Sequence, residues 1–100
     1  MKEVLRVCNE ICSLIAPELI IFYGKKVHVS DEKIKSFDLC IVADTADKLE
    51  TEKQIYLNVE ASVPFNIIIY TPSEWQEHSQ DEGSHAHFIL KKGTVIYDKR

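Results

Sequence analysis

The sequence predicts a small α/β domain in which helices pack against one mixed β-sheet. Two observations carry this prediction: amphipathic segments alternate with short β-branched ones, and the chain has 100 residues, enough for one hydrophobic core. Apolar residues make up 45% of the sequence and charged residues 28%, as in ordinary folded proteins. We therefore expect residues 1–100 to form a single domain without internal repeats or linkers.

Two longer helices are expected. Over residues 2–16, apolar side chains recur at spacings of three and four, and Pro17 ends the helix because the residue before a proline avoids the α region. Over residues 45–61, acidic residues come early and apolar ones share a side. The residues expected on that common side are Leu49, Tyr56 and Val59.

Two shorter helices are expected in the C-terminal third. Residues 71–75 are typical of a helix start, with Ser73 as a capping residue. Ser84 is expected to cap the last helix, and Gly93 to supply its left-handed ending. The aromatic residues expected to pack these helices onto the sheet are Trp75 and Phe88.

Short apolar runs predict the strands. Residues 19–23, 37–42 and 65–70 are rich in β-branched and aromatic side chains, and residues 95–97 could add a brief fourth strand. The polar, lysine-rich segment 24–36 is expected to be a loop.

Charge and cysteine content narrow the function classes. The net charge of −4 gives no general attraction to nucleic acid or to an anionic membrane, and no apolar stretch is long enough to span one. The N-terminus is not typical of a signal peptide. Cys8, Cys12 and Cys40 lie among apolar residues, which favours buried free thiols and a cytoplasmic location.

Four segments in order carry a family resemblance. They are IIFYGK over residues 20–25, SFDLCIV over 36–42, NIIIYTPSEW over 66–75 and ILKKGTVIY over 89–97. Together they resemble the minimal nucleotidyltransferase family, and the resemblance covers nearly the whole chain. It implies a nucleotidyltransferase-like fold and a site that holds ATP and Mg²⁺.

The resemblance also implies the site residues. The family has a Gly-Ser turn after its first strand, an Asp-x-Asp on the second and a third acid opening a later strand. Here Gly24 is followed by Lys25, Ser36 stands at the first Asp position, Asp38 is the remaining acid, and Asn66 replaces the third acid. Asp38 is therefore the expected catalytic residue and metal ligand, with the phosphates near Gly24, Lys25 and Ser36.

The chemistry explains why these substitutions matter. Nucleotidyl transfer needs carboxylates that converge on divalent metals, and residues two apart on a strand point the same way. Ser36 and Asn66 are degenerate positions, because their oxygens carry no charge. The other nearby acids lack the spacing to replace them: Asp31, Glu32, Asp44 and Glu60.

Three functions follow from the resemblance. The first is an antitoxin-like or regulatory module that has mostly lost catalysis and binds a HEPN-type helical protein. The second is an active Mg²⁺-dependent enzyme that moves AMP from ATP to a hydroxyl, and the third is a nucleotide sensor without turnover. Separately, His78, His85 and His87 are close in sequence, but the last two do not share a helical face, which favours a surface cluster over a metal site.

Overall fold

The computed structural model, which describes residues 1–100, contains four strands and four helices in the predicted order. The strands are β1 (Leu19–Val27), β2 (Ile34–Val42), β3 (Phe65–Tyr70) and β4 (Thr94–Asp98). The helices are α1 (Lys2–Ile15), α2 (Lys48–Asn58), α3 (Pro72–His78) and α4 (His85–Lys92). The predicted α/β class is confirmed.

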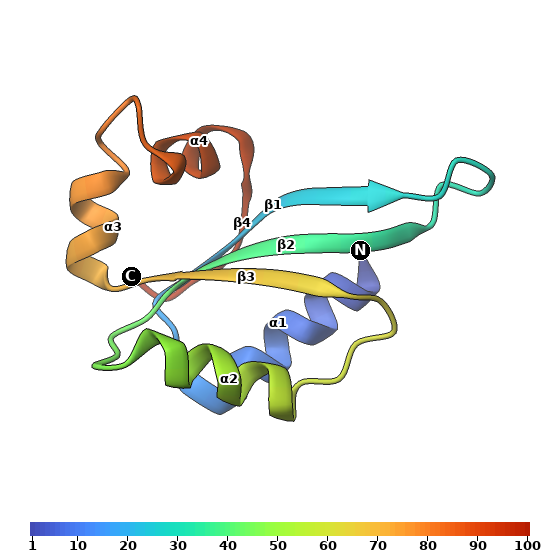
Figure 1. Ribbon diagram of the computed structural model, residues 1–100, viewed down its shortest axis with the longest axis horizontal. Coiled ribbons are helices and arrows are strands. Elements are labelled where there is room, and N and C mark those ends of the chain that lie inside the picture. Colours follow the sequence, from blue (N-terminus) through green and yellow to red (C-terminus); the bar gives the residue numbers. More distant parts are fainter.

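The four strands form one mixed sheet in the order β3-β2-β1-β4 (Figure 1). β1 pairs antiparallel with β2 and with β4, whereas β2 and β3 run parallel. The parallel pair requires a crossover connection, which α2 provides. The brief strand expected near residues 95–97 is therefore β4, an edge strand of the sheet.

Helices cover both faces of the sheet, but unequally (Figure 1). α1 and α2 pack on one face, where Ile11 and Ile55 are fully buried with Leu39 of β2. α3 and α4 pack on the other face, where Trp75 and Ile89 are buried. They lie at one end of that face, so the β1–β2 hairpin projects beyond them in the figure.

The hairpin differs from the prediction. β1 does not end at residue 23 but continues to Val27, and the expected loop over 24–36 is mostly strand, with the chain reversing where the His28 amide donates to the Lys33 carbonyl at 2.9 Å. Both arms beyond Gly24 are largely exposed, so their side chains lack the apolar alternation that predicts a strand. Pairing between the two strands holds them extended instead.

The buried side of α2 also differs from the prediction. Ile55 and Val59 are buried, whereas Leu49 is 76% exposed and Tyr56 is exposed as well. Asp47 caps the helix by accepting from the Glu50 amide, which places Leu49 in the first turn. Packing of Ile55 into the core with α1 and the sheet leaves Leu49 facing solvent.

In the C-terminal helices, Trp75 is buried as expected, but Phe88 is 51% exposed on α4. α3 is capped by Thr71, not by Ser73: the Thr71 hydroxyl and the Glu74 carboxylate form a capping box. Ser84 caps α4 as predicted. Gly93 is extended, with φ −83°, and is not left-handed, because the chain passes directly into β4.

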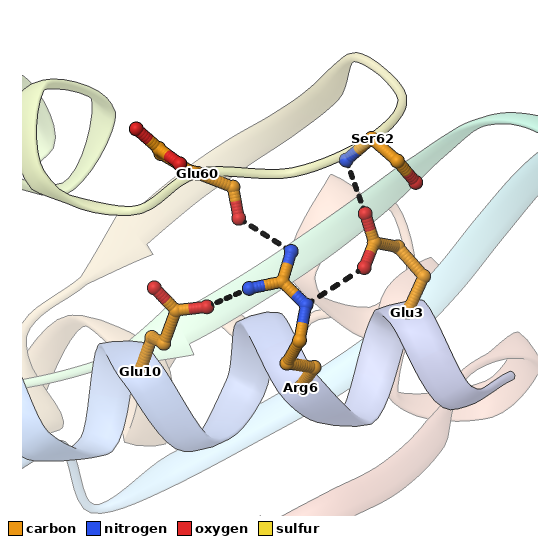
Figure 2. A network of polar contacts seen from close by, with 5 residues as sticks. All are labelled: Glu3, Arg6, Glu10, Glu60 and Ser62. Carbon is orange, nitrogen blue, oxygen red and sulfur yellow. Dashed lines mark hydrogen bonds and ion pairs between the residues drawn. The ribbon is translucent and has the colours of Figure 1, made fainter.

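A polar network joins α1 to the segment before β3 (Figure 2). The Arg6 guanidinium donates to the carboxylates of Glu3 and Glu10 and, at 2.6 Å, to the Glu60 carbonyl. The Glu3 carboxylate in turn accepts from the Ser62 amide. These bonds lower the pKa of Glu3 from 4.5 to about 2, with the Arg6 contact as the largest cause.

The cysteines are free, and Cys8 and Cys40 are buried while Cys12 is half-buried. Burial raises the pKa of Cys8 and of Cys40 to about 12. None of the helices combines the length and the apolar character that crossing a membrane requires.

Candidate functional site

Three of the predicted site residues lie side by side on neighbouring strands. Gly24 of β1 is opposite Asp38 of β2, and Asp38 is opposite Asn66 of β3. The Asn66 Nδ2 donates to Asp38 Oδ1 at 3.1 Å, and a Cβ on Gly24 would lie 2.7 Å from Asp38 Oδ2. We call Gly24, Asp38 and Asn66 the polar row.

The position of the polar row explains how an aspartate fits in an interior strand. Asp38 alternates with Phe37 and Leu39, whose side chains are buried under α1 and α2, so its own side chain is on the α3/α4 face. Asp38 is only half-buried there and Asn66 is exposed. Partial hydration and the Asn66 hydrogen bond avoid the cost of an unpaired buried charge.

Strand alternation decides which neighbours share the face of the polar row. Ser36 lies two residues before Asp38 and is opposite Lys26. Lys25 is opposite Phe37, whose side chain is in the core on the other face, so the structure does not bring Lys25 to the polar row. The basic residue beside Ser36 is Lys26. If β1 had been predicted to continue beyond residue 23, the spacing of two between Gly24 and Lys26 would have indicated that Lys26 shares the face of the polar row.

Tyr23 borders the polar row on the side of α4, and sequence reasoning missed it. An irregularity in the register between Phe22 and Gly24 leaves Tyr23 unpaired with β2, and its ring contacts the α3/α4 core. The ring meets His85 edge-on, with centroids 5.8 Å apart. Burial, and secondarily the Asp38 charge, raise the pKa of Tyr23 to about 12.

The donor set of the polar row does not fit Mg²⁺. Asp38 is its one carboxylate, and no three His, Cys, Asp or Glu side chains of the chain are grouped closely enough to hold a metal ion. Mg²⁺ prefers charged oxygen ligands, which Ser36 and Asn66 do not offer. The acids considered as replacements are exposed and outside the row: Asp31, Glu32, Asp44 and Glu60.

The three histidines have separate surroundings. His87 Nδ1 lies 2.8 Å from the Ser79 carbonyl, His85 stacks on Phe88, and His78 faces the ring of Tyr70. They do not share a common centre with acidic side chains.

The polar row lies on an open part of the sheet face. The structure has five surface hollows, and none of them is lined by a residue of the row. Small molecules are usually held in concave pockets, so this surface is better suited to a macromolecule.

Comparison of the chain with protein-family models, curated proteins and solved structures gives no match. The nucleotidyltransferase resemblance therefore stays a hypothesis that rests on the sequence motifs.

Proposed function

We propose that this protein is a nucleotidyltransferase-type domain without a working metal centre, and that it acts by binding a protein partner. One observation carries the proposal: the single carboxylate of the polar row, Asp38, is held by the Asn66 amide on an open sheet face. The partner class we propose is a HEPN-type helical protein, as the family resemblance implies, with an antitoxin-like or regulatory role.

Chemistry and shape both support this choice over transfer of a nucleotide. Metal-dependent transfer needs several charged oxygens at one point to neutralise the phosphates, and the polar row supplies one carboxylate. Because no hollow includes the row, a nucleotide would be held on one side only. A protein partner needs no pocket and can cover a flat polar surface.

Calorimetric titration with ATP, with and without Mg²⁺, tests the proposal. We expect no saturable binding to the native protein. The double variant S36D/N66D restores the two acids beside Asp38 and is expected to bind Mg²⁺, because register places all three side chains on one face. Adding Asp38→Ala to that variant should abolish the gain.

Each opposite result has a definite meaning. Magnesium-dependent ATP binding by the native protein, lost in Asp38→Ala, would overturn the proposal in favour of a sensor or an enzyme, which an assay of AMP transfer would separate. No Mg²⁺ binding by S36D/N66D would contradict the expectation that positions 36, 38 and 66 correspond to the three acids of a nucleotidyltransferase metal site.

A further inference from the structure

The strand β1 has an open edge on the side of β4. β4 pairs with β1 only from Leu19 to Phe22, so residues 23–27 have no neighbouring strand on that side. This part of β1 belongs to the hairpin that projects beyond α3 and α4 (Figure 1). An unpaired strand edge presents main-chain donors and acceptors to any extended segment that can align with it.

The strand register indicates that one residue of this segment directs its main-chain N–H and C=O away from β2, toward the open edge. The Phe37 amide donates to the Pro64 carbonyl at 3.4 Å, so it points toward β3 and away from β1. In an antiparallel pair, the residue opposite an outward-pointing one also points outward. Lys25 is opposite Phe37, and its N–H and C=O are therefore directed to the open edge.

The projecting hairpin is basic, unlike the rest of the chain. Between residues 24 and 36 it carries four lysines against two acids, whereas the whole chain has a net charge of −4. All four lysines are exposed, and none forms an ion pair. The lysines are Lys25, Lys26, Lys33 and Lys35.

We propose that the open edge of β1 at residues 23–27 binds an extended, acidic segment of a partner protein as an added strand. Main-chain hydrogen bonds would give the affinity, and Lys25 and Lys26 would select acidic side chains on the added strand. This inference rests on the proposed partner-binding function and names the surface and the chemistry of the partner.

Charge argues against two other occupants. Edge-to-edge pairing with a second copy would bring the lysines of one edge against those of the other, which opposes self-association. Nucleic acid would need a larger positive surface than this arm provides, because Asp31 and Glu32 lie at its turn. Both alternatives are outcomes of the test below.

The test uses an end-blocked heptapeptide of alternating glutamate and valine, titrated into ¹⁵N-labelled protein. We expect saturable shifts at residues 23–27 and slower amide exchange at Lys25. A peptide of equal charge with alternate prolines cannot pair as a strand and is expected to bind at least tenfold more weakly. K25E/K26E should lose at least tenfold in affinity, whereas K91E/K92E, which reverses the exposed pair on α4, should retain it.

The inference would be overturned if the proline peptide bound as tightly as the glutamate–valine peptide, or if K25E/K26E bound that peptide as tightly as the native protein. It would also be overturned if the signals of residues 23–27 did not respond to the peptide and shifted instead when the protein alone was diluted or when oligouridylate was added. Circular dichroism verifies that the variants fold. The peptide titration and the ATP titration can fail independently. Binding of MgATP would overturn the partner-binding proposal, but it would leave the result of the peptide titration unchanged. Conversely, absence of both kinds of binding would overturn only the edge inference.

Discussion

The Asn66 amide donates a hydrogen bond to the Asp38 carboxylate across the parallel β2–β3 pair, with Nδ2 3.1 Å from Oδ1. The other carboxylate oxygen lies over Gly24 of β1, where a side chain would collide with it at 2.7 Å. Asp38 is thus oriented by the strands on both sides. This arrangement depends on an amide at position 66, because a carboxylate there would repel Asp38.

Asn66→Asp should lower the free energy of unfolding at pH 7 by up to about 1 kcal/mol, since it places like charges opposite one another. Asn66→Ala, which removes the hydrogen bond without adding charge, should cost about 0.5 kcal/mol at this exposed position. Urea denaturation measures both. If Asn66→Asp is no less stable than Asn66→Ala, the two side chains do not face each other in solution.

Gly93→Ala should destabilise the protein by about 2 kcal/mol or more, as overpacking of a well-packed core does. A Cβ there would lie 2.3 Å from Ile21 Cγ2 and 2.7 Å from the Ile89 carbonyl, and the carbonyl belongs to a helix that cannot move freely. Gly24→Ala is the matched control. Its added methyl meets only the movable end of Asp38, so we expect a smaller loss of stability. Thermal denaturation measures both variants.

The Glu3–Arg6 contact should make stability depend on pH in the acid range. The folded-state pKa of Glu3, about 2, is below its ordinary value of 4.5, so the ionised form stabilises the fold above about pH 5 and this contribution is lost as the pH falls toward 2. Solvent screening of this surface pair limits the contribution to about 1 kcal/mol. Denaturation of Glu3→Gln between pH 2 and 7 should show a shallower pH dependence.

A control for this prediction lies in the same network. Glu60 contacts Arg6 through its main-chain carbonyl (Figure 2), so Glu60→Gln should keep the pH dependence of the native protein. Equal slopes for Glu3→Gln and the native protein would contradict the assignment.

Tyr56→Phe should cost about 0.5–1 kcal/mol, because the Tyr56 hydroxyl accepts a hydrogen bond from the Ile67 amide at 3.0 Å on the outer edge of β3. Hydrogen exchange at Ile67 should accelerate in the variant. Tyr97→Phe removes a hydroxyl without such a bond and should leave stability nearly unchanged. Unaltered exchange at Ile67 would mean that Tyr56 does not cover this edge.

The order of the elements could be predicted where burial leaves a periodic signal. Segments such as Leu19–Ile21 are apolar because helices cover them, and Pro17 and Ser84 mark helix boundaries by local chemistry. The distal half of the hairpin could not be predicted, because the two strands pair there through their main chains while most of their side chains are solvated. The buried side of α2 was misjudged because Leu49 and Ile55 are equally apolar, and only tertiary packing selects Ile55.

The polar row was only partly predictable. Residue types at Asp38 and Asn66 indicated that the two belong to one site, and register brings them together. The face of Lys25 was missed because β1 was expected to end at residue 23, although alternation from Gly24 would have indicated it. The irregularity near Tyr23, which sets the face of Gly24 itself, was not predictable. One extra residue in a strand exchanges the faces of all that follow.

The pairing of Leu19 with Asp98 closes a loop of about four-fifths of the chain. Contacts so distant in sequence are entropically costly to close and tend to form late, and β4 buries no side chain fully. We therefore expect β4 to be the first strand to detach in local opening, with faster amide exchange than β2. Each such opening would extend the free edge of β1 from the hairpin back toward Leu19, so that the length of strand available for pairing fluctuates with the C-terminal segment.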